Sequence, residues 1–126
     1  MATNPQFVGT PRINGCIISV ANTARDGSGT LGSVLVAGAS GSRVDRVKVK
    51  AQGTTTAGMV RFFTYDGANY RFITEVSVSA ATPSATVQAF EYDLDLNLFM
   101  PNGYTLYAST HNAETFYVTP IIAGDF

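Results

Sequence analysis

The stretch Phe90-Glu91-Tyr92-Asp93-Leu94-Asp95-Leu96-Asn97-Leu98 decides the fold class of this chain. Large apolar side chains stand at every second position, and acidic or amide side chains stand between them. A period of two is that of a β-strand, whose successive side chains point to opposite faces of the sheet. The alternation therefore predicts a strand with one face on a core and the other in water or at an interface. Because its apolar side chains are large, we predict that this strand is central to the core.

Short segments with strand character recur along the rest of the chain, and each break between them supplies Gly, Pro, Asn or Asp for a turn. The eight predicted strands are 15–21, 31–37, 43–51, 59–65, 70–79, 87–98, 104–110 and 115–122. Between Tyr65 and Tyr70, the sequence Asp66-Gly67-Ala68-Asn69 predicts a β-hairpin. No segment shows a helical period with caps. Short strands at nearly regular spacing predict an all-β antiparallel sandwich or barrel, and we favour the sandwich.

The chain has 126 residues, which fits one domain. Its first segment, residues 1–14, carries prolines and no clear alternation, so we predict an extended N-terminal arm followed by a sandwich domain over residues 15–126. We expect the arm to reach onto a neighbouring subunit; the alternative is a disordered or strand-like tail packed on its own domain. The candidate interface residues of the arm are Pro5, Phe7, Pro11 and Arg12.

The composition is poor in charge. Charged residues make up 13% of the chain, about half the usual share of roughly 25%, and the net charge is −1. Nucleic-acid binding relies on an excess of Lys and Arg, so neither nucleic acid nor an anionic membrane surface is an expected partner. No apolar run is long enough to span a bilayer. A low charge suits neutral sheet faces, and it also suits a subunit that hides surface in an assembly; both interpretations stay open.

The N-terminus and the single cysteine indicate the compartment. The segment from Met1 to Pro11 has no basic region followed by an apolar core, so we predict no signal peptide. Cys16 has no second cysteine with which to form an internal disulfide or a multi-thiolate zinc site. We expect it to be a small buried hydrophobe. Synthesis and folding in a cytoplasm follow from these features.

Two rows of opposite charge are the clearest candidates for an interface. At strand spacing, the basic row consists of Arg46, Lys48 and Lys50, and the acidic row of Glu91, Asp93 and Asp95. If their strands are neighbours, the rows can pair within the chain. If not, each row can meet its complement on an adjacent subunit, or both can face solvent. A flat acidic row does not wrap a cation, so we predict no metal site.

Enzymatic chemistry finds little support in the sequence. The only histidine, His111, lies in one turn with Ser109, and residues so close in sequence do not converge as a catalytic triad does. The glycine-rich segments 27–29 and 38–41 lack the spacing and the Lys-Ser/Thr of a phosphate loop. We therefore predict no catalytic residue and no cofactor, and the protein is not expected to be an enzyme.

Aromatic side chains gather around the predicted hairpin, at Phe62, Phe63, Tyr65, Tyr70 and Phe72. Such a group can form a stacking platform for a carbohydrate or a nucleic acid. Because the chain has no Trp and Phe is prominent in the group, we favour packing in the core.

Two parts of the chain resemble small bacteriophage virion proteins of the jelly-roll type. One is the string Leu98-Phe99-Met100-Pro101-Asn102-Gly103-Tyr104-Thr105-Leu106-Tyr107-Ala108-Ser109-Thr110. The other is the opening from Pro5 to Arg12, together with the later turn over residues 25–30. The resemblance covers most of the chain, and it rests on structural motifs.

The resemblance implies a capsid decoration protein, also called a cement protein, which bridges subunits of the major capsid protein. Such proteins are small β domains and often trimers, so the resemblance also implies a homotrimer on the capsid surface of the virion, made in the host cytoplasm. The family carries no catalytic residues. The alternative is a tail or fibre component with a receptor- or carbohydrate-binding role.

Overall fold

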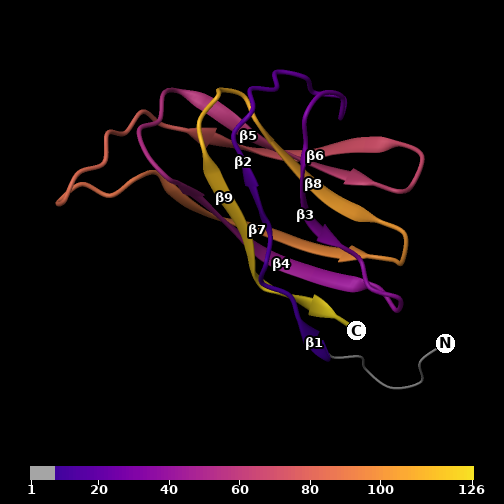
Figure 1. Cartoon of the computed structure of the whole chain (residues 1–126). Coiled ribbons are helices and arrows are strands. Elements are labelled where there is room, and N and C mark those ends of the chain that lie inside the picture. The colour runs from indigo at the N-terminus through magenta and orange to yellow at the C-terminus, as the bar shows by residue number, and fades with distance from the viewer. Residues whose placement is uncertain (1–7) are drawn as a thin grey trace.

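The computed structural model describes residues 8–126, which form nine β-strands and no helix. The strands lie in two sheets that pack face to face, and the two ends of the described chain lie close together (Figure 1). All pairings between these strands are antiparallel. The prediction of an all-β antiparallel sandwich is confirmed.

The first sheet, sheet A, has the order β1-β9-β4-β7, and β2 also pairs with β9. Its strands are β1 (Thr10–Pro11), β2 (Cys16–Ile18), β4 (Ser42–Ala51), β7 (Glu91–Met100) and β9 (Phe116–Asp125). The second sheet, sheet B, has the order β3-β8-β5-β6. Its strands are β3 (Gly32–Val36), β5 (Gly58–Tyr65), β6 (Tyr70–Val78) and β8 (Thr105–Thr110).

The chain pairs with itself as one long, nested hairpin. Strand β5 pairs with β6, and outside this pair β4 pairs with β7, β3 with β8, and β2 with β9. The innermost turn is the predicted one: the Asp66 amide donates to the Asn69 carbonyl at 3.2 Å. The Asp66 carboxylate accepts from the amides of Ala68 and Asn69, and Gly67 has a φ of +99°. These residues form the turn because Asp accepts local amide hydrogen bonds and Gly tolerates positive φ.

Each of the eight predicted strands has a counterpart among β2 to β9. The largest shift is at the strand predicted for residues 87–98, which starts only at Glu91. Just before it, the Ser84 amide donates to the Val87 carbonyl at 3.0 Å, and the Ser84 hydroxyl accepts from the Val87 amide. This turn belongs to the connection between β6 and β7, residues 79–90, which extends well beyond the sheets (Figure 1).

The prediction that the Phe90–Leu98 segment is central to the core is wrong. Its strand, β7, is the last in sheet A and pairs only with β4, so its apolar face reaches only the margin of the sandwich. Tyr92 is 47% exposed, and the leucines of β7 are half-buried. The centre of the core comes from strands with a neighbour on each side. Its fully buried side chains include Val44, Val47, Val49, Val60, Phe62, Leu106, Phe116 and Val118.

Candidate interface surfaces and polar sites

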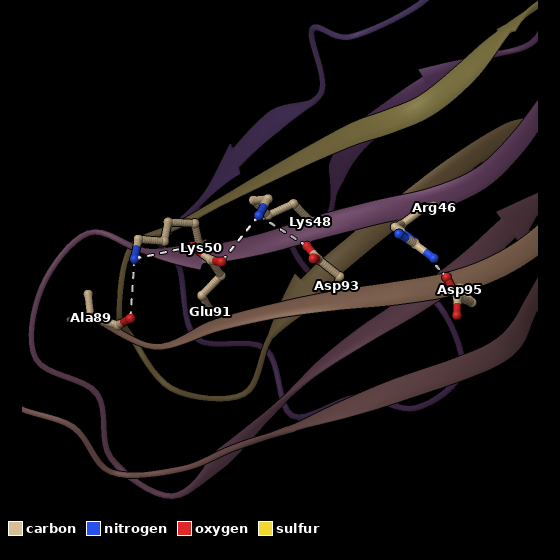
Figure 2. A network of polar contacts seen from close by, with 7 residues as sticks. All are labelled: Arg46, Lys48, Lys50, Ala89, Glu91, Asp93 and Asp95. Carbon is tan, nitrogen blue, oxygen red and sulfur yellow. Dashed lines mark hydrogen bonds and ion pairs between the residues drawn. The ribbon is translucent and has the colours of Figure 1, made fainter.

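The two predicted rows of charge lie side by side, because β4 and β7 are neighbours in sheet A. The register places Arg46 opposite Asp95, Lys48 opposite Asp93, and Lys50 opposite Glu91. Arg46 approaches Asp95 at 2.7 Å, Lys48 lies 3.2 Å from both Asp93 and Glu91, and Lys50 lies 3.4 Å from Glu91 (Figure 2). We call these six residues the β4–β7 ladder. Of the alternatives open from the sequence, the structure has pairing within the chain.

The ladder is exposed to solvent along its length. Its side chains keep between 33% and 63% of their surface accessible. Hydrogen bonds from Lys48 lower the pKa of Glu91, and the bonds to Glu91 and Asp93 raise the pKa of Lys48. Exposed ion pairs of this kind add little stability, whereas complementary charges on adjacent strands disfavour a shifted register. A role of the ladder in an interface stays a prediction.

The described part of the predicted arm, residues 8–14, lies along the last strand of its own domain. The Gly9 amide donates to the Asp125 carbonyl at 2.8 Å, and the Arg12 amide donates to the Ala123 carbonyl at 3.0 Å. Pro11 pairs with Gly124 in the β1–β9 register. The candidate residues Pro5 and Phe7 lie outside the described residues. Residues 9–12 therefore pack on their own domain, as in the alternative prediction for the arm.

The Asp125 carboxylate joins three distant parts of the chain. It accepts from the Arg12 guanidinium at 2.9 Å and from the Ser42 hydroxyl at 2.5 Å. The same Ser42 oxygen accepts from the Gly38 amide at 2.9 Å. The hydrogen bond from Ser42 and the bond and charge of Arg12 lower the pKa of Asp125. Sequence reasoning identified only Arg12 of this group, because its partners are separated by 83 and 113 residues.

An apolar patch lies beside the arm on the outer side of sheet A. Ile13 is 65% exposed and Phe99 is 64% exposed. A cavity of about 340 Å³ lies between the arm and strands β4 and β9. Arg43 lines this cavity and also lies over the Phe99 ring, 5.5 Å from its centroid, so it connects the cavity to Phe99. We call this surface the arm-end patch; its apolar members are Val8, Pro11, Ile13, Ile121, Ile122 and Phe99.

The connection between β2 and β3, residues 19–31, lies over part of the outer side of sheet B, and we call it the cover loop. Its Arg25 pairs with Glu75 at 2.9 Å and lies 5.8 Å from the centroid of the Phe72 ring. Gly27 lies so close to Tyr70 that an added Cβ would be 2.3 Å from the tyrosine Cβ. Phe63, on this outer side of the sheet, is fully buried.

The prediction that the aromatic group packs in the core is confirmed for Phe62, whereas Phe63 is buried on the outer side of sheet B. The prediction is wrong for Tyr70 and Phe72. Tyr70 and Phe72 are 39% and 37% exposed. The β5–β6 register shifts between Phe62 and Phe63, which places Phe72 opposite Phe63. This irregularity turns Phe72 away from the core side and onto Phe63, with ring centroids 5.3 Å apart.

The neighbourhood of His111 differs from a hydrolase triad. His111 Nδ1 lies 3.2 Å from a terminal nitrogen of Arg61. Because a guanidinium can only donate, Nδ1 is the acceptor, and no carboxylate within the described chain orients this ring. The Ser109 hydroxyl is buried and makes no hydrogen bond with the described protein groups.

Cys16 is half-buried, and burial raises its pKa to about 11. Its thiol therefore stays protonated and weakly nucleophilic at neutral pH.

Among residues 8–126, no three His, Cys, Asp or Glu side chains come close enough to bind a metal ion together. The same residues include no helix of the length and hydropathy that crossing a membrane requires. Comparison with protein-family models, with curated proteins and with solved structures found no match to this chain.

Proposed function

We propose that this protein is a non-enzymatic structural component of a bacteriophage particle, which decorates the capsid and stabilises it by bridging subunits of the major capsid protein. The observation that carries the proposal is the arm-end patch. Contiguous exposed apolar surface on a small domain marks an interaction site more often than an unused face. The patch also combines an aromatic ring with an arginine, two residue types that are enriched at protein interfaces.

The order of the strands supports the jelly-roll part of the proposal. The nested pairs β2–β9, β3–β8, β4–β7 and β5–β6 form one long hairpin that is folded over into two sheets. Except at the β5–β6 turn, every connection from β2 onward crosses from one sheet to the other. Jelly rolls consist of eight strands in two such sheets, and viral capsid proteins use them widely.

The remaining parts of the proposal follow from the resemblance of the sequence. They are a homotrimer on the capsid surface and synthesis in the host cytoplasm. The expectation that neither nucleic acid nor membrane is a partner rests instead on the near-neutral charge and the lack of a long apolar run. The low content of charge agrees with a subunit that buries much of its surface against neighbours. The connection 79–90 offers a second contact, because it extends beyond the sheets and its Val87 is half exposed.

The test is the number and location of copies on purified particles. Quantitative mass spectrometry and labelled antibodies should find many copies on the shell, and shells without the protein should break at a lower temperature. A few copies confined to the tail would contradict the proposal.

A variant pair tests the patch itself. Phe99→Asp should weaken binding to purified shells that lack the protein, since it places a charge in the apolar contact. Val36→Asp is the matched control, because Val36 is also more than half exposed but lies on sheet B. Equal binding by both variants would remove the arm-end patch from the interface.

A carbohydrate-binding role in a tail or fibre is the second candidate. Tyr65, Tyr70 and Tyr107 form an aromatic cluster on sheet B, with ring centroids 4.3 to 6.2 Å apart. Tyr70 is 39% exposed and the other two are half-buried, and an exposed tyrosine ring can stack on a sugar ring. Glycan-array binding that is lost in Tyr70→Ala would favour this candidate over the capsid role.

A further inference from the structure

Arg61 is a buried guanidinium on β5, with 2% of its surface exposed. Its five N–H donors find two acceptors in the described chain, both at long distances. One terminal nitrogen donates to the Asn22 carbonyl at 3.4 Å, and the other to His111 Nδ1 at 3.2 Å. The Nε–H, which is shielded from solvent, has no acceptor among these groups.

No carboxylate of the described residues forms an ion pair with Arg61. Glu75 is its cross-strand partner in the register, but the Glu75 carboxylate pairs with Arg25 of the cover loop at 2.9 Å. A buried charge is costly unless an opposite charge or a full set of hydrogen bonds compensates it. The Arg61 guanidinium is therefore a buried cation that lacks an anionic partner among the described residues.

An open cavity of about 420 Å³ is lined in part by Arg61. Its volume falls within the range of small-molecule sites, roughly 300–1,000 Å³. Polar side chains on its wall come from β5 (Arg61), β6 (Ser77), the turn after β8 (His111) and the cover loop (Arg25), and apolar groups complete it. The residues that matter for binding are Arg25, Met59, Arg61, Ser77 and His111.

We propose that this cavity binds a small organic anion through its carboxylate or phosphate group, with Arg61 as the buried cation of the site. The planar fork of an arginine fits both groups with two parallel hydrogen bonds. Arg25, which also pairs with Glu75, adds a second guanidinium to the cavity wall. Because His111 Nδ1 accepts from Arg61, the neutral ring carries its proton on Nε2 and can donate to the same anion. Met59 offers an apolar contact for the rest of the ligand. The site lies on sheet B, so it is independent of the proposed capsid contact on sheet A.

The test uses the full chain and three probes that share one sugar ring: glucuronate, glucose 6-phosphate and glucose. The Arg61 Nε–H resonance in ¹H–¹⁵N NMR spectra reports the occupancy directly. We expect saturable shifts of this resonance with glucuronate, with glucose 6-phosphate, or with both, together with a higher midpoint of thermal unfolding. Which anion shifts it shows whether the ligand group is a carboxylate or a phosphate. Glucose, which has no charge, should shift nothing.

Variants decide whether the shifts come from this cavity. Arg61→Lys keeps the charge but loses the planar fork, so the affinity should fall about tenfold or more. Arg25→Gln should also weaken binding, and its exposed side chain makes folding of this variant secure. Arg71→Gln removes another exposed arginine that does not line the cavity, and the affinity of this variant should be unchanged.

Three outcomes would overturn the proposal. The first is the absence of a saturable shift with either anion, which would leave Arg61 as a structural clamp for Asn22 and His111. The second is an equal response to glucose. The third is an affinity that Arg25→Gln leaves unchanged, and this variant decides the question even if Arg61→Lys fails to fold.

Discussion

The outer faces of the two sheets differ in how much of their surface the chain itself covers. On sheet B, the cover loop lies over the strands, so that Phe63 is fully buried although it points away from the central core. On sheet A, Phe99 stacks on Phe126 with ring centroids 6.1 Å apart, and Arg43 lies over its ring, yet the residue keeps 64% of its surface exposed. The cover loop buries part of the outer face of sheet B, whereas the surface around Phe99 on sheet A stays exposed. This difference is the main reason for assigning the proposed capsid contact to sheet A.

The cations on the two faces also differ, both in burial and in whether they have a carboxylate partner. The cations of the β4–β7 ladder are exposed, and each has a carboxylate within 3.4 Å. Arg61 on sheet B is buried and has no carboxylate partner in the described chain. An exposed ion pair contributes little free energy of folding, so losing it has a small effect. A buried cation is costly without an anion beside it. The ladder therefore serves mainly to favour the correct register between β4 and β7, and Arg61 is a candidate ligand-binding group.

The largest effect should come from removing a side chain beneath the cover loop. Phe63→Ala empties a fully buried site and should lower the free energy of unfolding by about 3–5 kcal/mol. Phe99→Ala, on the open face, should change it by no more than about 0.5 kcal/mol. Urea denaturation of both variants checks the pair. Similar losses of unfolding free energy in the two variants would mean that Phe63 and Phe99 are covered to a similar extent.

The cover loop itself should depend on Asn22. Its buried side chain donates to the Ser28 and Thr30 carbonyls at 2.9 Å and accepts from the Ala24 amide at 3.0 Å. Asn22→Ala should cost about 1–3 kcal/mol, because it leaves these groups without their partner. Hydrogen exchange should also become faster at the Arg61 side chain beneath the loop. Asn102→Ala, in an exposed turn, is the control, and an equally small effect of both substitutions would contradict this role of Asn22.

Acid should weaken the anchor of the arm on sheet A. The pKa of Asp125 is lower in the folded chain than its ordinary value of 3.8. The ionised carboxylate therefore stabilises the fold above that ordinary value, and the contribution is lost as the pH falls through the lower, folded value. Asp125→Asn should reduce the loss of stability between pH 5 and pH 2, measured by urea denaturation at each pH. An unchanged pH profile would show that the network around Asp125 is not a source of stability.

The smallest effect is expected in the β4–β7 ladder. A double-mutant cycle with Arg46→Gln and Asp95→Asn should give a weak coupling, since both side chains are largely exposed. The coupling should vanish near 1 M salt, where the screening length is about 3 Å. A strong coupling that persists in salt would contradict the picture of the ladder as a solvent-exposed device for register.

Local sequence patterns determined most of the secondary structure. Alternation and turn residues located all of the strands from β2 to β9 and the turn at Asp66–Asn69, because period and turn chemistry act over a few neighbouring residues. The same alternation correctly assigned Val47 and Val49 to the core and the basic row to the outer face. It did not reveal that β7 is an edge strand, since an edge strand and a central one can show the same alternation along the chain.

The candidate sites were decided by the tertiary structure. The sequence identified both rows of charge, but only the pairing of β4 with β7 made them a ladder. Ser42 and Asp125 meet across 83 residues, and Arg61 lies 50 residues from His111. A pattern over a few neighbouring residues cannot reveal contacts between residues so far apart in the sequence. The burial of Arg61 without a carboxylate is a property of the packed sheets and the cover loop together, because solvent accessibility depends on everything that surrounds a side chain in space.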